Sequence, residues 1–436
     1  MGNYFKNIPA RFKNFFGNSG RETYASMCLM GTGQMLNGQY VKGLLYLLAE
    51  VAFVAYFAVR GVGDIIGFFT LGTQKADAWL GIEGDNSVIM LLWGIFAWFA
   101  LVVLVALWVS NIKDAQKYAD MRPFKTLPTF KDDLSSLLNK NFCKFILVLP
   151  LVGVGIFNVL PIVFMILIAF TNYGGDIVPP ELVDWSLDSF KKLVALGELS
   201  QSFVKILGWN LLWAFASTFA NYFMGLGLAL LFNKKCVKGK AIWRAFPVLA
   251  YAMPGFITLL AFKFMFINNM IVADGGKIID FFGINSTWMS RGIGFFVNAW
   301  LSVPSIMLLA TGILSNINAD LYEAAKIDGA SSWVQFKKIT LPFLIFSTTP
   351  VLISQFIGNF NNFGVFFFLR SNVTSEGYFL ASDTDLLINW LYRMSIDKNY
   401  YSIGAAISLV IFIITSVLSL IVYVRSASYK KEDTFR

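Results

Sequence analysis

Long apolar stretches constrain this chain more than any other feature. Each of eight stretches has about 20 or more mostly apolar residues, which is enough for a helix to cross a membrane. They lie at residues 41–60, 88–110, 145–170, 205–232, 246–267, 293–315, 343–366 and 402–424. Inside a bilayer, backbone groups must pair within a helix or a closed barrel. The sequence therefore predicts an all-α polytopic membrane protein with about eight transmembrane helices.

The composition excludes several classes of function. Charged residues make up 14% of the chain, whereas a soluble domain has about 25%. The chain has no histidine, which excludes His-based triads, HExxH zinc sites and histidine proton relays. Its three cysteines, Cys28, Cys143 and Cys236, match no metal or redox spacing. No GxxxxGK[ST] phosphate loop occurs, so this chain is not expected to bind ATP by that route, and we expect no catalysis and no cofactor in it.

The distribution of basic residues predicts the orientation in the membrane. Most of the 35 Lys and Arg residues fall in the N-terminus, in the tail, or in the segments 111–144, 233–245 and 316–342. Basic loops mark the cytoplasmic side, so both termini are predicted to lie inside the cell. The net charge of +9 is then explained by topology and by contact with lipid, and it requires no nucleic acid.

Polar composition also suggests the domain boundaries. The segment 111–144 is polar and contains prolines, so it is predicted to be a cytoplasmic linker. Residues 1–110 would then form a cytoplasmic N-terminus and a two-span unit. Residues 145–430 would form a six-span core that carries a cytoplasmic loop at 316–342.

Two features of the N-terminal part have alternative interpretations. The glycine-rich segment 24–40 is either a re-entrant turn or a plain helix entry with close packing. Glu50 lies within the first apolar stretch, where an isolated charge is costly. It is either a proton or cation site or a structural hydrogen-bond partner, for example of Gln34, Asn37 or Gln39. The scarcity of other acidic residues in the core favours the structural role.

The polar loop at 316–342 has the pattern of a helical hairpin. Asn318 can cap a first helix, and Gly329 can end it in a left-handed conformation. Ser331 or Ser332 can cap a second helix, which leads into the next span at Pro342. From these residues alone, an ordinary inner loop that happens to be helical is the alternative.

The spacing within this loop resembles the EAA motif of ABC importer permeases. That motif is EAA, three residues, Gly, nine residues, and Ile-x-Leu-Pro. The matching residues are Glu323, Ala324, Ala325, Gly329, Ile339, Leu341 and Pro342, and Asp328 directly precedes the glycine. The resemblance implies a type I ABC importer permease core. It also implies that the first helix of the loop docks into a separate ATPase subunit, present in two copies, which binds ATP and Mg.

The resemblance extends over the core from about residue 145 to 430. The phrases "NFNNFG", "TDLLINWLYR" and "GAAISLVIF" are similar to segments of the larger membrane subunit of maltose and maltodextrin importers. That likeness implies a bacterial cell membrane, a second homologous permease and an extracellular sugar-binding protein. One departure is clear: the well-known enterobacterial version has a large outer domain where this chain has only the short loop 171–202.

Polar residues in the seventh apolar stretch suggest a substrate. Gln355, Asn359 and Asn362 recur at i, i+4 and i+7, which is one face of a helix, and Asn361 and Phe363 lie beside them. Amides can bond sugar hydroxyls and aromatic rings can cover the apolar faces of a sugar. Amides also join helices to one another, and we expect that packing role for Asn210 in the fourth stretch. For span seven, the family resemblance favours sugar contact.

The predicted function is therefore that of the transmembrane permease subunit of an ATP-driven importer. It would move an oligosaccharide, maltose or maltodextrin, into the cytoplasm by alternating access. Another oligosaccharide, such as a raffinose-type sugar, is the first alternative. An ion-coupled secondary transporter is the second, although such proteins usually carry carboxylates at the site within the membrane.

Overall fold

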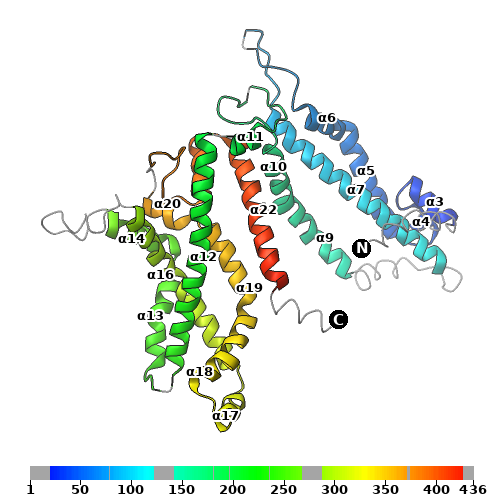
Figure 1. The fold of residues 1–436 in the computed structure, drawn as a ribbon. Helices are drawn as coiled ribbons and strands as arrows, with labels where there is room; N and C mark the ends of the chain where they lie inside the picture. Colours follow the sequence, from blue (N-terminus) through cyan, green and yellow to red (C-terminus); the bar gives the residue numbers. More distant parts are fainter. Residues whose placement is uncertain are drawn as a thin grey trace. The chain divides into compact units, whose positions relative to one another are not determined.

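The structure is a computed structural model that describes residues 20–77, 79–121, 142–179, 181–195, 197–234, 236–267, 287–370 and 374–425. The chain divides into two compact units, Met1–Ser186 and Leu187–Arg436. Both units are helical (Figure 1), and within the described ranges the only β-type pairings are three isolated bridges. The predicted all-α class is confirmed.

The first unit is built on long apolar helices. The helices of this unit are α3 (Arg21–Cys28), α4 (Thr32–Leu36), α5 (Tyr40–Tyr56), η1 (Phe57–Gly61), α6 (Val62–Thr70), α7 (Ser87–Met121), α9 (Phe142–Val154), η3 (Gly155–Val159) and α10 (Leu160–Ile168). Helix α5 continues through the π-helical turn η1 into α6, which gives one span from Tyr40 to Thr70. Because α7 runs to Met121, it extends into the predicted linker, and residues 122–141 of that linker lie outside the described residues.

The glycine-rich segment before the first span is a hairpin of two short helices, α3 and α4. The chain turns at Gly31, whose φ of +89° is a left-handed conformation that suits glycine. Asn111 of α7 holds the hairpin by its side chain and its backbone: the Gly31 N–H donates to Asn111 Oδ1 at 3.0 Å, and Gln34 Nε2 donates to the Asn111 carbonyl at 2.8 Å. The segment is therefore not a plain continuation of the first span.

Glu50 accepts a hydrogen bond at the same hairpin. The backbone N–H of Met30 donates to its Oε2 at 2.7 Å. This is the structural role that the sequence favoured, although the partner is a backbone group and not one of the predicted amides.

The second unit is a bundle of helices. Its helices are α11 (Asp188–Val194), α12 (Glu198–Asn233), α13 (Lys240–Ala252), α14 (Gly255–Ile267), α16 (Thr287–Ser315), α17 (Ala319–Ile327), α18 (Ser332–Gln335), η4 (Phe336–Thr340), α19 (Leu341–Phe360), α20 (Gly364–Arg370), α21 (Leu387–Tyr392), η5 (Arg393–Asp397) and α22 (Tyr401–Arg425). Helix α12 packs along α16 and α19, so it is the central helix of the unit.

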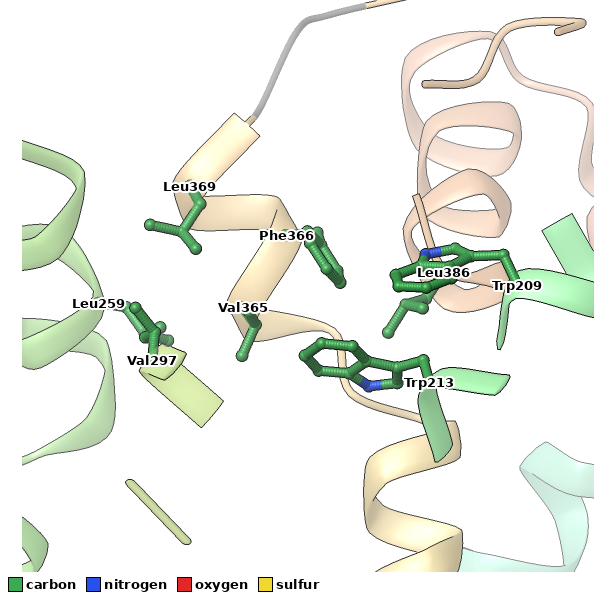
Figure 2. Close-up of a cluster of buried hydrophobic side chains, with 8 residues drawn as sticks. All are labelled: Trp209, Trp213, Leu259, Val297, Val365, Phe366, Leu369 and Leu386. Carbon is green, nitrogen blue, oxygen red and sulfur yellow. The ribbon is translucent and has the colours of Figure 1, made fainter. Parts of the chain in front are cut away.

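Two apolar clusters hold α12 in place. One joins α12 to α16 and α19 through buried residues that include Tyr222, Ile306 and Leu344. The second cluster (Figure 2) gathers Trp209, Trp213, Leu259, Val297, Val365, Phe366, Leu369 and Leu386. The ring centroids of Trp213 and Phe366 are 4.9 Å apart, so α20 is packed directly against α12. Large buried aromatic pairs of this kind contribute strongly to the stability of a core.

The count of spans agrees with the prediction, but the span made by α13 and α14 is not straight. Within the described residues, seven helices are long and apolar enough to cross a membrane, or eight if the bent pair α13 and α14 is one span. That pair bends by 92° at Met253–Pro254, where the chain is extended (Met253 ψ 139°). Proline disfavours a helical conformation in the residue before it, so the uninterrupted helix expected over 246–267 is wrong.

Candidate functional site

The polar hairpin, residues 316–342, forms as its sequence predicts. The Asn318 side chain accepts a hydrogen bond from the Asp320 N–H at 3.0 Å and caps α17. At the other end of α17, Gly329 adopts φ +76° and its N–H donates to the Lys326 carbonyl at 3.0 Å. The Ala330 N–H donates to the Ala325 carbonyl at 2.8 Å, which completes a Schellman motif. The predicted cap and the predicted glycine stop are confirmed.

The second helix of the hairpin begins at the first of the two candidate serines. Ser331 Oγ accepts from the Val334 N–H at 3.4 Å, and Ser332 is the first residue of α18. The chain continues through η4 into α19, and the Tyr322 hydroxyl lies 2.8 Å from Thr340 Oγ1. This contact fixes α17 against the start of the long span.

The hairpin lies at one end of the bundle formed by α12, α13, α16 and α19 (Figure 1). Of the predicted coupling residues, Glu323, Ala324, Asp328, Gly329 and Pro342 are exposed, while Ala325, Ile339 and Leu341 are half-buried. Apolar side chains are exposed here too: Ile327 is 87% exposed and Trp333 is 67% exposed. Such residues on a projecting hairpin offer a contact surface to a partner protein or to the membrane.

Span seven is interrupted where the predicted sugar residues lie. Helix α19 ends at Phe360 and α20 begins at Gly364, and we call residues Asn361–Phe363 between them the break. Gln355 and Asn359 still lie one turn apart on α19. The prediction that Asn362 shares their helical face is wrong, because the helix has ended before it.

The amides at the break form a ladder across three helices. Asn359 Nδ2 donates to Thr218 Oγ1 on α12 at 2.9 Å, and Asn298 Nδ2 on α16 donates to Asn359 Oδ1 at 3.3 Å. Asn362 Nδ2 donates to Asn298 Oδ1 at 3.1 Å, while its own Oδ1 accepts from the Val365 N–H at 3.2 Å. Asn359 and Asn362 therefore join helices in this structure, as the packing alternative expects.

The other three predicted sugar residues are less fully engaged. Asn361 is exposed. The Phe363 ring stacks on Phe367 at 4.4 Å and lies 5.2 Å from the Tyr392 ring. The buried Oε1 of Gln355 receives no hydrogen bond from the residues that the structure describes. An unpaired buried amide oxygen is costly, so Gln355 has capacity for a further partner.

A groove of about 730 Å³ runs between α19 and α22 and reaches the break at Asn361. Pro350, Ile353 and Ile357 form its α19 wall. Small hydroxyl residues recur along the α22 wall, and they are Ser408, Thr415, Ser416 and Ser419. The lining is mostly apolar, with the hydroxyls confined to one side.

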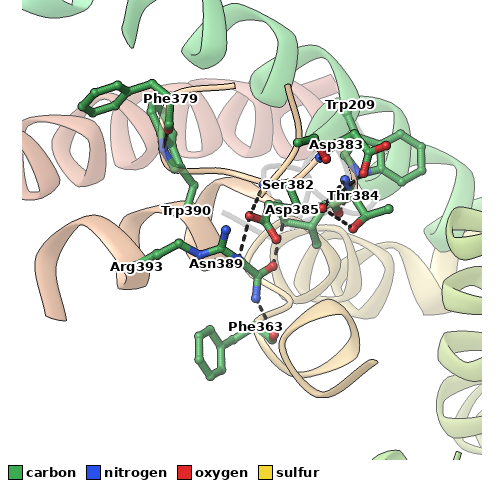
Figure 3. A network of polar contacts seen from close by, with 12 residues as sticks. Trp209, Phe363, Phe379, Ser382, Asp383, Thr384, Asp385, Asn389, Trp390 and Arg393 are labelled. Atoms are coloured by element: carbon green, nitrogen blue, oxygen red, sulfur yellow. Dashed lines mark hydrogen bonds and ion pairs between the residues drawn. The ribbon is translucent and has the colours of Figure 1, made fainter. Parts of the chain in front are cut away.

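The sequence did not predict the polar network that covers the break. We call residues 374–400 the cap segment. Asp385 and Arg393 form an ion pair at 3.2 Å with side chains 2% and 14% exposed (Figure 3), and Asp385 also accepts from the Ser382 N–H at 2.7 Å. The spacing of Asp385, Asn389 and Arg393 at i, i+4 and i+8 was the available signal, but it does not identify their partners.

An arginine on α16 reaches the same cap segment. Arg291 donates to the Asp383 carbonyl at 2.6 Å, and its guanidinium lies 3.9 Å from the centre of the Trp209 ring. The Trp209 indole in turn donates to the Thr384 carbonyl at 3.2 Å. The cap segment is thus attached to both α12 and α16.

Comparison with known proteins places this architecture in a family. The family described as "Binding-protein-dependent transport system inner membrane component" matches residues 221–427. The maltodextrin transport system permease protein MalC of Streptococcus pneumoniae is 32% identical over 422 residues, covering 92% of this chain and 95% of that protein. The galactooligosaccharides transport system permease protein GanP of Bacillus subtilis is 32% identical over 417 residues, covering 92% and 96% respectively.

A solved structure shares the fold. The bacterial ABC transporter involved in the import of the acidic polysaccharide alginate has a chain that aligns with a TM-score of 0.52. The alignment covers 66% of this chain and 96% of that one, at 19% sequence identity. At this identity, the likeness concerns the fold alone.

These findings confirm the resemblance to the membrane subunits of maltodextrin importers. The relatives are transporter subunits of the inner membrane and not enzymes. The apolar helices of this chain fit the same setting. The chain belongs to the binding-protein-dependent ABC permeases and is a multi-pass sugar permease.

Proposed function

We propose that this permease imports maltose and maltodextrins, and that sugar passes the break in span seven. The observation that carries the proposal is the grouping of Asn361, Asn362 and Phe363 in a non-helical segment of an apolar span. Irregular backbone within a membrane occurs where it lines a cavity or is covered by protein. Amides and an aromatic ring at such a point suit a neutral polyol.

The predicted sugar residues divide into two roles under this proposal. Asn361 is exposed and Gln355 has an unpaired buried oxygen, and both are assigned to direct contact with sugar together with the half-buried ring of Phe363. Asn359 uses both ends of its amide within the bundle, so it holds the site together in this conformation. Asn362 stands between these cases, because it is half-buried and donates to Asn298.

The polar hairpin is assigned to coupling with an ATPase. The exposed EAA residues, Glu323 and Ala324, lie on α17, which is rigidly capped at both ends. A rigid exposed helix can transmit a movement of its partner to the span that follows it. We assign ATP and Mg to that partner, in two copies per transporter, and we place both termini in the cytoplasm on the distribution of Lys and Arg.

We assign the groove between α19 and α22 to the second permease and not to sugar. Its mostly apolar lining offers a polyol few hydrogen bonds. A row of small hydroxyl residues, Ser408, Thr415, Ser416 and Ser419, is typical of a surface where another membrane helix packs closely. An extracellular binding protein would deliver the sugar from the other side of the membrane.

Galactooligosaccharides are the second candidate substrate, because GanP and MalC have equal identity to this chain over nearly equal lengths. Ion-coupled transport is disfavoured. The long helices α12, α13, α14, α16, α19 and α22 contain a single acidic residue, Glu198, at the first position of α12. Such transporters usually need carboxylates within the membrane.

Sugar uptake in cells that lack this chain tests the proposal. Uptake of labelled maltose, maltotriose, raffinose and galactobiose is compared before and after the chain is restored. We expect maltose and maltotriose uptake to be lost and recovered with the chain. Loss confined to galactobiose would establish the second candidate, and unchanged uptake of maltose and maltotriose would refute the maltodextrin assignment.

A further inference from the structure

Side chains from distant elements bond three backbone carbonyls at the break. The last carbonyls of a helix have no partner within it, and the hydrocarbon of a membrane supplies none. Trp213 Nε1 donates to the Asn359 carbonyl at 3.1 Å, and Asn210 Nδ2 donates to the Phe360 carbonyl at 3.1 Å. On the far side of the break, Asn389 Nδ2 donates to the Phe363 carbonyl at 2.7 Å. The Asn359 carbonyl also accepts from the Asn362 N–H at 3.3 Å and the Phe363 carbonyl from the Phe367 N–H at 3.4 Å, whereas the described residues give the Phe360 carbonyl no backbone donor.

Two of these donors also bond the cap segment. Asn210 Oδ1 accepts from the Leu387 N–H at 3.0 Å, and Asn389 Oδ1 accepts from the Leu386 N–H at 3.2 Å. Asn210 therefore joins one edge of the break to the first turn of α21. Asn389 lies in that turn and joins it to the other edge of the break. Asn210 is fully buried and Asn389 is 4% exposed, so water does not substitute for either bond.

The cap segment is itself firmly attached, so it can serve as a reference point. Ser202 Oγ accepts from the Phe379 N–H at 2.7 Å, and Trp390 Nε1 donates to the Phe379 carbonyl at 2.8 Å (Figure 3). The buried Asp385–Arg393 ion pair joins the chain just before α21 to the first residue of η5. Movement of α21 relative to α12 would strain the Asn210 bridge, and movement of α21 relative to the break would strain the Asn389 bond.

We propose that Asn210 and Asn389 are positioning residues that fix the break to the cap segment and thereby set the geometry of the sugar contacts. The carbonyls they hold, those of Phe360 and Phe363, bracket Asn361 and Asn362. The Phe363 ring also lies against Tyr392 of α21, so α21 places both the backbone and the ring. This inference rests on the proposed function, because the residues being positioned are the proposed sugar contacts.

Isosteric variants isolate the donated bonds. Asn210→Asp and Asn389→Asp keep the oxygen that accepts from α21 but replace the N–H₂ donor with a second carboxylate oxygen. The matched control is Asn399→Asp in the same cap segment, where the side chain only accepts, from the Tyr401 hydroxyl at 2.9 Å. Asn389→Ala removes the donor without adding a charge and is the second variant if the carboxylate prevents assembly.

The first measurement is the dependence of uptake on maltotriose concentration, in cells that carry each full-length variant with its partner subunits. We expect Asn210→Asp and Asn389→Asp to raise the half-saturating concentration by about tenfold, the scale of one buried hydrogen bond lost. The maximal rate should fall much less, and Asn399→Asp should match the parent chain. A loss of maximal rate with unchanged half-saturation would assign the two amides to folding alone and overturn the proposal.

The second measurement does not depend on which sugar is carried. A cysteine at the break (Asn361→Cys) is labelled with a maleimide in a chain whose Cys28 and Cys143 are replaced by serine. The exposed native Cys236 serves as the internal reference. We expect Asn389→Asp or Asn389→Ala to change the labelling rate at position 361 several-fold relative to Cys236.

The two measurements separate the possible failures. If the parent chain does not carry maltotriose, the proposed substrate is wrong, but the labelling rate still decides whether Asn389 positions the break. If the labelling ratio is the same with and without the Asn389 donor, the positioning role is refuted whatever the substrate.

Discussion

The polar hairpin and the break both interrupt the apolar pattern of the second unit, but they are held in different ways. In the hairpin, each cap bonds a group no more than five residues away, as Asn318 does with Asp320 and Ala330 with Ala325. At the break, Asn210 reaches the Phe360 carbonyl 150 residues away. The hairpin is thus a local structure carried by the bundle, whereas the break exists only because the bundle supplies its partners.

This difference teaches how the two regions should respond to change. Substitution of a local cap should loosen one short helix and leave the rest of the protein unaffected. Substitution of a distant partner should leave a buried polar group unsatisfied, which costs more.

Substitution Gly329→Pro should abolish sugar uptake while the protein still inserts and assembles. Proline cannot adopt φ +76°, and it removes the N–H that bonds the Lys326 carbonyl. Uptake and membrane content are measured together. The control is Ala319→Pro at the first position of α17, where proline is tolerated and uptake should persist. Normal uptake by Gly329→Pro would refute the coupling role of the hairpin.

Substitution Arg393→Met should destabilise the cap segment. Removal of one partner from a buried ion pair costs about 3–5 kcal/mol, because the Asp385 carboxylate loses its countercharge. The thermal midpoint of the purified complex in detergent should fall by several degrees. Lys191→Met is the control, since the Lys191–Asp188 pair is exposed and such pairs contribute at most about 1 kcal/mol. Equal shifts for both variants would contradict the distinction.

The same substitution, Asn→Asp, should reduce sugar uptake strongly at the break and very little in the hairpin. Asn362→Asp keeps the oxygen that accepts from Val365 but loses the donor to Asn298, so uptake should fall by about tenfold. Asn318→Asp keeps the oxygen that caps α17, and Asp caps as well as Asn does, so uptake should stay within about twofold. Equal losses measured in parallel uptake assays would remove the contrast between the regions.

Removal of one local cap should give the smallest effect. Asn318→Ala loses the bond to the Asp320 N–H, which costs about 1 kcal/mol of helix stability. Amide exchange in α17 should accelerate by roughly fivefold, with little change in α19 and α20. Exchange that also accelerates at the break would show that the two regions are not independent.

Much of the fold was accessible from the sequence because its signals are local. The number of apolar spans follows from length and composition, the ends of α17 follow from Asn318 and Gly329, and the start of α18 follows from Ser331. The EAA spacing indicated the family, and the comparisons confirmed it. These signals need no knowledge of what lies beside them in space.

The break was not predicted, because its determinants are not local. The spacing of Gln355, Asn359 and Asn362 fits one helical face, and nothing nearby in the sequence ends the helix at Phe360. Pro350 and Gly358 both lie inside α19, so neither proline nor glycine marks the end of the helix. Side chains of α12 and α21 bond the carbonyls at the break, and the donor to the Phe360 carbonyl, Asn210, lies 150 residues away.

The sequence by itself determined the membrane-spanning class, the family and the capped hairpin, because periodicity, capping and motif spacing act over a few residues. The tertiary structure decided where span seven breaks, that Asn359 and Asn362 join helices, and that Asp385 and Arg393 close the cap segment. A buried polar group needs a partner, and the partners that join the break to other helices, such as Asn210 and Asn298, lie far away in the chain. Asn210 shows this most clearly. Its position in an apolar stretch predicted helix packing, but only the fold shows that it bonds the Phe360 carbonyl at the break and the Leu387 N–H of α21.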